Sequence, residues 1–280
     1  MPLRLDATGK TSRPFINRYS WRDYALYALG VGAGPADLRY LLDDPPAAAL
    51  PTFGVVPAFV PVVTLLREIG GDLTNLLHNS QEVRNLGAWP HDTEVRTTAE
   101  VAGIWDMKVA ALVDIRTRTD DDAGRTIAET SWQLLLRGEG GFGGPRPPAL
   151  FRAKVPDGVK PVLEREVPTL PVQALLYRLS GDINPIHSKP EVAAAAGFDR
   201  PILHGLCTFG TAAREVLDHV LSGEIPRFAG MSGRFLKVVF PGDTLVVRAY
   251  EDAASLIVAV RVKERGEQVL AAKIETGNPE

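Results

Sequence analysis

Hydrophobic residues around position 210 recur at helical spacing. Between Leu203 and Leu221 they lie three or four residues apart, at Leu206, Phe209, Ala213, Val216, Leu217 and Val220. This spacing places side chains on one face of an α-helix, and Gly223 just beyond it is a typical stop signal. The pattern predicts a long, mostly buried helix over residues 203–221.

A different pattern follows this helix. Four short runs are rich in β-branched residues, alternate in part between apolar and polar positions, and are separated by turns that contain glycine, aspartate or alanine. They are Phe235–Phe240, Thr244–Tyr250, Leu256–Val262 and Val269–Thr276. We expect these runs to form antiparallel strands.

The first half of the chain has the same order of patterns. An apolar stretch, Phe53–Leu66, precedes three strand-like runs, which are Glu94–Val101, Ala110–Arg118 and Thr126–Arg137. Pro57 is tolerated in a first helical turn, but Pro61 removes a hydrogen bond in mid-helix. We therefore expect the helix of the first half to be distorted or shortened. A helix followed by an antiparallel meander, twice, predicts an α+β fold.

Short sequence matches support an internal repeat. LYALGVG at residues 26–32 aligns with LYRLSGD at 176–182, and PTF at 51–53 aligns with PIL at 201–203, both at an offset of 150. WPHDT at 89–93 aligns with FPGDT at 240–244 at an offset of 151. Three matches in order indicate two copies of one fold; the alternative is chance similarity among Leu, Gly and Pro.

The segment between the two copies is rich in glycine and proline. It reads RGEGGFGGPRPP over residues 137–148, a composition that cannot continue a helix or a central strand. We predict a first unit over residues 1–140, a linker over 141–160 and a second unit over 161–280.

Composition narrows the class of protein. With 45% hydrophobic and 23% charged residues among 280, the chain is neither disordered nor collagen-like. Its longest apolar stretch is shorter than the roughly 20 residues of a membrane span.

A net charge of -3 gives no basic surface for nucleic acid. A single cysteine, Cys207, excludes an internal disulfide and argues against a thiolate zinc site. No signal-like segment is present, so we expect a cytoplasmic protein.

Side chains suited to acid–base chemistry gather in one segment, YRLSGDINPIH, over residues 177–187. Asp182, Asn184 and His187 lie within six residues, and the glycine and proline among them favour a loop. An ionised carboxylate and a neutral imidazole that share one water can polarise it at pH 7. The alternative is an Asx turn, in which Asp182 and Asn184 bond nearby backbone and His187 is a surface residue.

A second candidate lies at the start of the predicted long helix, in PILHGL at residues 201–206. The first N–H groups of a helix lack intrahelical partners and stand at the positive end of its dipole. Gly205 has no Cβ, so a ligand carbonyl can approach its N–H closely and be stabilised as it gains negative charge. The alternatives are a packing role for Gly205 and a buried structural role for His204.

The repeat shows that these groups are confined to the second copy. At an offset of 150 the pairs are Asp182 with Gly32, Asn184 with Gly34, His187 with Asp37, His204 with Gly54 and Gly205 with Val55. Residues that only built the fold would be needed in both copies. Their loss from one copy favours a duplicated domain with a single active site.

The segments YRLSGDINPIH, RPILHGLCTFG and GRFLKVVFPGDTL resemble those of the MaoC-like (R)-specific enoyl-CoA hydratases, the hydratase 2 family. The first half is similar to the family's non-catalytic half through WRDYALYALGVGAG, LLHNSQ and RGEGGFGG. The resemblance implies a double hotdog, in which each half wraps an antiparallel sheet around its long helix and the two sheets join side by side. It also implies a homodimer.

The resemblance implies a role for each residue of the loop. Asp182 and His187 would hold the catalytic water, Asn184 would help to orient them, and the Gly205 N–H would receive the thioester oxygen. The reaction would be reversible hydration of a trans-2-enoyl-CoA to the (R)-3-hydroxyacyl-CoA, with the substrate carried as a CoA thioester and with no cofactor and no metal.

Five further residues are candidate substrate contacts by the same resemblance: His78, Asn79, Lys108, His204 and Phe235. Asn79 stands where the family motif LLHGEQ has glycine, and Lys108 is displaced within a segment that the family writes Asp-Lys-Gly. Surface or core packing is the alternative for these positions. A shortened helix in the first half would remove packing atoms beside the site and leave room for a long acyl chain.

Rival functions remain open on the sequence. Hotdog scaffolds host several thioester reactions, so an acyl-CoA thioesterase is one alternative. A non-catalytic acyl-thioester-binding subunit is another. A two-metal hydrolase is disfavoured because the chain has five histidines, no H-x-H pair and no cysteine cluster to supply ligands.

Overall fold

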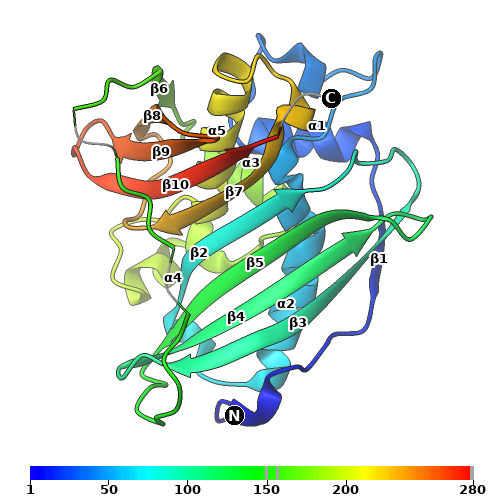
Figure 1. Cartoon of the computed structure of the whole chain (residues 1–280). Helices are drawn as coiled ribbons and strands as arrows, with labels where there is room; N and C mark the ends of the chain where they lie inside the picture. Colours follow the sequence, from blue (N-terminus) through cyan, green and yellow to red (C-terminus); the bar gives the residue numbers. More distant parts are fainter. Residues whose placement is uncertain (149–150, 156–157, 278–280) are drawn as a thin grey trace.

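The computed structural model describes residues 1–148, 151–155 and 158–277. Its ten strands form one antiparallel sheet (Figure 1). The strands of the first half are β1 (Phe15–Arg18), β2 (Leu76–Asn85), β3 (Glu94–Asp106), β4 (Ala110–Asp120) and β5 (Thr126–Arg137). Those of the second half are β6 (Leu163–Pro168), β7 (Phe228–Phe235), β8 (Thr244–Asp252), β9 (Ser255–Val262) and β10 (Gln268–Thr276).

The strand order shows the internal repeat directly. It runs β1-β3-β4-β5-β2 and then β7-β10-β9-β8-β6, so the second half repeats the first in reverse across the β2–β7 junction. The two junction strands pair antiparallel, with Ser80 opposite Arg234 and Arg84 opposite Gly230. This arrangement, two tandem units whose sheets join side by side, confirms the predicted double hotdog and its α+β class.

One long helix lies behind each half of the sheet (Figure 1). The helices of the chain are α1 (Trp21–Gly30), α2 (Val55–Ile69), α3 (Gln173–Tyr177), α4 (Pro190–Ala195) and α5 (Gly205–His219). The α2 helix packs against β3 and β4, and α5 packs against β7, β8 and β10. Both long helices have 15 residues, and their bounds differ by the 150-residue offset of the repeat.

The predicted shortening of the first-half helix is wrong, because α2 is as long as α5 and contains Pro61. A proline inside a helix costs about 3 kcal/mol through one lost hydrogen bond and a steric clash. Burial of one complete face outweighs that cost, since Pro61 is itself buried with Val62, Leu65 and Ile69. No missing turn therefore creates room for a ligand beside α2.

The apolar composition of this helix reflects core packing. Residues 51–69, which include the 3-10 turn before α2, are long and apolar enough for a membrane span, with a mean hydropathy of 1.5. In the fold, 61% of the window is buried. The helix is the centre of a hotdog unit.

One predicted strand is also wrong. The run Phe235–Phe240 is not a strand, because β7 ends at Phe235 and residues 236–243 form a loop. The strand instead covers FAGMSGRF, whose glycines and small residues give no alternating pattern. Pairing with β2 on one side and β10 on the other recruits this segment into the sheet.

The predicted linker lies between β5, which ends at Arg137, and β6, which begins at Leu163. The described residues between these strands contain neither helix nor strand. Residues 149–150 and 156–157 of the predicted linker lie outside the described residues. The boundaries at 140, 141, 160 and 161 stay a prediction.

Candidate active site

The segment rich in acid–base residues is a loop between two turns. The α3 helix runs into a 3-10 turn over Arg178–Ser180, and Gly181, with φ of +121°, ends that turn in a conformation that favours glycine. A second 3-10 turn covers Pro185–His187. Asn184 connects the two: its backbone N–H donates to Asp182 Oδ1 at 3.2 Å, and its side-chain oxygen accepts the Ile186 N–H at 3.2 Å.

The local Asx turn is therefore present, but His187 is not a surface residue. Its imidazole is buried and stacks on the ring of His204, with centroids 3.6 Å apart and an interplanar angle of 26°. Nitrogen and oxygen atoms of Asp182, His187 and His204 all lie within 4.8 Å of one another. The structure thus brings three predicted site residues together, while Asn184 is exposed and shapes the turn beneath them.

Backbone carbonyls define the tautomers of both histidines. His187 Nδ1 lies 2.9 Å from the Ile202 carbonyl, and His204 Nε2 lies 3.1 Å from the Asp182 carbonyl. A carbonyl oxygen only accepts hydrogen bonds, so each of these nitrogens carries the proton. In the neutral rings, His187 Nε2 and His204 Nδ1 are then bare acceptors.

Burial alters the acidity of all three groups. It raises the pKa of Asp182, against the opposing effects of His187 and of the Asn184 N–H. It lowers the pKa of His187, with Asp182 acting in the opposite direction. It lowers the pKa of His204 to about 2, assisted by His187. Both imidazoles are therefore neutral at pH 7, and His187 Nε2 can accept a proton.

Gly205 stands at the first position of α5, directly after His204. Within the described residues its N–H has no hydrogen-bond partner, as expected at a helix N-terminus. A Cβ at this position would lie 3.1 Å from the Phe235 ring, so a side chain here would crowd Phe235. The amide is therefore free among the described residues, and its role as the donor to a thioester oxygen stays a prediction.

His78, on β2 of the first half, lies against the Phe235 ring. Its ring stacks on Trp132, with centroids 5.1 Å apart, and meets Phe235 edge-on at 4.9 Å. Burial lowers the pKa of His78 to about 4. Asn79 lies at a β-bulge between His78 and Ser80, and both His78 Nε2 and Asn79 Nδ2 are buried without a partner. His78 therefore lies beside Phe235, and the role of His78, Asn79 and Phe235 as substrate contacts stays a prediction.

Lys108 lies apart from this group. It occupies the turn between β3 and β4, with φ of +70°, and its N–H donates to Asp106 Oδ1 at 2.6 Å. Asp106 also accepts the N–H groups of Gly141 and Gly143. The described interactions of Lys108 are those of a tight turn, and its role as a substrate contact stays a prediction.

A small hollow beside the loop was not predicted. It is lined by residues of both halves: Val55, Val56, Phe59, Tyr177, Ser180, Asp182 and Leu206. The first three come from the first turns of α2, which the repeat aligns with the start of α5. That alignment was the signal that could have identified them, because the pseudosymmetry places the starts of both helices near the centre of the molecule.

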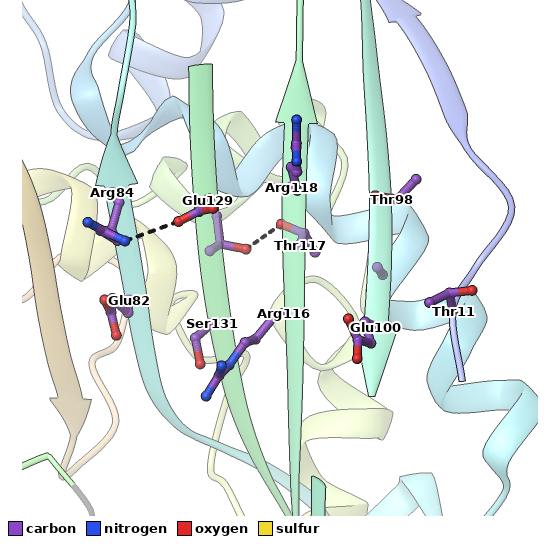
Figure 2. A pocket seen from close by; sticks show the side chains of 12 residues that line it. Thr11, Glu82, Arg84, Thr98, Glu100, Arg116, Thr117, Arg118, Glu129 and Ser131 are labelled. Carbon is purple, nitrogen blue, oxygen red and sulfur yellow. Dashed lines mark hydrogen bonds and ion pairs between the residues drawn. The ribbon is translucent and has the colours of Figure 1, made fainter. Parts of the chain in front are cut away.

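A larger hollow lies on the other face of the sheet, away from α2 (Figure 2). It is lined mainly by charged and hydroxyl side chains of β2 to β5, and Arg84 pairs with Glu129 at 3.2 Å across it. None of the predicted site residues lines it.

The first copy uses the matching loop for structure. Asp37, which corresponds to His187, accepts the Gly34 N–H at 2.8 Å and pairs with Arg214 of α5 at 3.2 Å. The predicted asymmetry is therefore visible as two different uses of one loop position.

Asp182, His187 and His204 have the atom types of a metal site, so we tested whether their geometry fits an ion. Imidazole nitrogens bind a metal within their ring plane at about 2.1 Å. The two rings are stacked 3.6 Å apart at 26°, so their planes meet well beyond that distance. This arrangement does not suit coordination of one ion by both histidines, and the absence of a metal stays a prediction.

The fold and this site define a double-hotdog protein with one acid–base loop, in its second unit. Two family descriptions match the chain: the MFE-2 hydratase 2 N-terminal domain over residues 17–138 and the MaoC like domain over residues 153–272. The chain therefore belongs to the MaoC-like hydratase 2 family, which its sequence motifs predicted.

Individual relatives cover almost the whole chain. It is 38% identical to the enoyl-CoA hydratase ChsH3 of Mycobacterium tuberculosis, over 98% of this chain and 99% of that protein. It is 34% identical to the peroxisomal enoyl-CoA hydratase 2 of Arabidopsis thaliana, over 92% and 90% of the two chains. The crystal structure of a MaoC-like dehydratase from Phytophthora capsici superposes with a TM-score of 0.88 at 27% identity, covering 99% of this chain and 98% of that one.

Proposed function

We propose that this protein catalyses the reversible hydration of trans-2-enoyl-CoA to (R)-3-hydroxyacyl-CoA. One observation carries the proposal: a carboxylate and a neutral imidazole with a bare nitrogen lie together at His204. The next residue is Gly205, whose N–H has no partner among the described residues. A water-activating pair and an oxyanion donor are the two groups that hydration of a conjugated thioester requires. Relatives named enoyl-CoA hydratase support the substrate class.

In the proposed reaction, Asp182 and His187 together take up and release the same number of protons. Water, held by Asp182 and His187 Nε2, forms a bond from its oxygen to C3, and the C2–C3 π electrons move toward the thioester carbonyl. The Gly205 N–H donates to that oxygen as an enolate forms. The pair takes one proton from the water and returns one proton to C2 on the same face, so its own charge is unchanged at the end.

The acyl group would lie against the first turns of α2. Val56 and Phe59 line the hollow together with Asp182, so the carbons beyond C3 would contact apolar side chains of the first half. Such a lining favours an alkyl chain over a polar group. We propose that α2 in this way supplies the acyl-chain side of the site without losing any helical turn.

Carrier, location and assembly belong to the same proposal. CoA as the carrier follows the names of the relatives, and His78, Asn79, Lys108 and Phe235 are its proposed contacts. A cytoplasmic location is proposed from the sequence, and a homodimer is proposed from the family resemblance; light scattering of the purified protein would test the dimer.

An assay with wild-type protein tests the function. Crotonyl-CoA and longer enoyl-CoAs are added, and conjugated enoyl absorbance, free thiol and the configuration of the product are followed. A hydratase removes the absorbance without thiol release and yields the (R)-hydroxyacyl product. Thiol release would indicate a thioesterase, and binding without turnover would indicate an acyl-thioester-binding subunit; either result would overturn the proposal.

A further inference from the structure

Three hydrogen bonds join the acid–base loop to the segment that enters α5. The Ile202 N–H donates to the Ile186 carbonyl at 3.3 Å. His187 Nδ1 donates back to the Ile202 carbonyl at 2.9 Å. The third bond comes from His204, whose Nε2 donates to the Asp182 carbonyl at 3.1 Å. His204 is therefore the side chain that fixes the position of Asp182 relative to the start of the helix.

The ring of His204 also supports His187. It lies between Tyr177, at a centroid distance of 4.8 Å, and His187, at 3.6 Å. Only 1% of His204 is exposed. The next residue along the chain is Gly205, so one residue touches the acid–base pair on one side and precedes the oxyanion donor on the other.

We propose that His204 is a positioning residue, which holds Asp182 by its backbone and His187 by its ring in register with the Gly205 N–H. This inference rests on the proposed hydratase function and assigns to His204 a task other than contact with substrate.

The cost of burying this imidazole favours such a task over simple packing. His204 Nδ1 is buried and has no hydrogen-bond partner within the described part of the chain, and an unsatisfied buried polar group costs about 1–3 kcal/mol. A phenylalanine would fill similar space without that cost. It would have no N–H for the Asp182 carbonyl, whereas Asn or Gln would have the N–H but no ring to stack on His187. Histidine combines both features.

His204 is also unable to compete for the proton in the reaction. Burial lowers its pKa to about 2, so the ring is neutral at pH 7. When His187 accepts a proton, the neighbouring ring stays a neutral, polarisable surface beneath the new charge. The catalytic proton therefore stays with Asp182 and His187.

The experiment compares His204→Phe, which keeps a ring and loses the donor, with His204→Gln, which keeps an N–H and loses the ring. The matched control is His91→Phe, at an exposed histidine outside the site. For both His204 variants we expect kcat for crotonyl-CoA to fall about 10- to 100-fold, the scale of a misplaced catalytic group. We expect KM to change less than about threefold, because no substrate contact is removed.

A second measurement does not depend on activity. In wild-type protein with ¹⁵N-labelled histidine, His204 must show the Nε2–H tautomer and His187 the Nδ1–H tautomer. In His204→Phe we expect the His187 ring to populate both tautomers. We also expect its pKa to move closer to the ordinary value of an imidazole. An Nδ1–H tautomer for His204 in the wild type would overturn the proposal even if no variant folds.

The two measurements separate the possible failures. Wild-type kcat in a folded His204→Phe, with an unchanged His187 spectrum, would overturn the positioning role. A wild-type protein without hydratase activity would refute the proposed function, while the tautomers and the effect of His204→Phe on His187 would still decide whether His204 holds the loop.

Discussion

At the scale of residues, two backbone carbonyls determine what the side chains can do. The Ile202 carbonyl requires a proton on His187 Nδ1, and this leaves Nε2 as the only basic atom of that ring. Burial then keeps the ring neutral. The main chain therefore decides which nitrogen of this general base is basic, while the stacked ring of His204 supports the imidazole.

Substitution of the acid–base pair should separate activity from folding. Asp182→Asn and His187→Ala each remove one proton-handling group, so we expect kcat/KM for crotonyl-CoA to fall about 10²- to 10⁴-fold. The Asn184 N–H and the turn around it remain, so we expect the melting temperature to change little. Steady-state kinetics and calorimetry of both variants provide the measurement. Near wild-type turnover in either variant would refute the assignment.

His78 makes a prediction about stability. Its pKa is about 4 in the folded protein and near 6.5 in the unfolded chain. The unfolded state therefore binds more protons below pH 6.5, and stability is lost as pH falls through that value, by about 2 kcal/mol at pH 5. His78→Phe keeps the stack on Trp132 and removes this loss, so urea unfolding at pH 7 and pH 5 should differ less in the variant by about that amount.

The control for this prediction is His91→Phe at an exposed position, which should leave the pH dependence of unfolding as it is in the wild type. An unchanged pH dependence in His78→Phe as well would show that His78 is protonated normally in the fold.

The sequence could single out Asp182, His187 and Gly205 as candidates because each lies in a short segment whose local chemistry is visible. It could not identify the contacts of these residues. The stack of His187 on His204 and the approach of Phe235 to Gly205 join segments whose distance depends on how β7 and α5 pack. Such contacts leave no local pattern.

At the scale of elements, the two long helices have the same length and different surroundings. The α5 helix is buried on nearly all sides, because residues 31–40 of the first half cover it. Among the described residues, the outward face of α2 is less covered: Val60 is 50% exposed. Helical periodicity predicted α5 well, whereas the Pro61 rule failed for α2 because a local penalty was weighed without tertiary burial.

The position of Val56 in the first turn of α2, beside the hollow that Asp182 also lines, predicts where acyl-chain selectivity lies. Val56→Trp enlarges a side chain that lines the small hollow beside Asp182, so chains longer than crotonyl should be excluded. We expect kcat/KM for a ten-carbon enoyl-CoA to fall at least about tenfold relative to crotonyl-CoA, through steric overlap. A chain-length series from four to sixteen carbons measures the effect.

Val60→Trp is the matched control, because it makes the same change one turn further along α2 at an exposed position. It should leave the chain-length profile unchanged. If Val56→Trp accepts all chain lengths equally, the acyl group does not pass along α2.

At the scale of the whole molecule, the two halves interlock as well as join at β2 and β7. Arg214 of α5 is buried and pairs with Asp37 of the first half at 3.2 Å, and its Nε donates to the Val31 carbonyl at 3.4 Å. Tyr40 reaches the same helix through Asp218 at 2.6 Å. The segment of the first half that corresponds to the acid–base loop supports the helix that begins at Gly205.

Arg214→Met should therefore destabilise the entire chain. The substitution keeps most of the side-chain volume but leaves Asp37, Glu215 and Asp218 without their shared cation. Removing one member of a buried ionic group typically costs about 3–5 kcal/mol. Urea unfolding at pH 7, followed by fluorescence, should show one shifted transition rather than two, because Arg214 connects both halves.

The control Arg165→Met removes a half-exposed partner of Glu215 and should cost about 1 kcal/mol or less. Equal, small losses in both variants would show that Arg214 does not help to hold the two halves together.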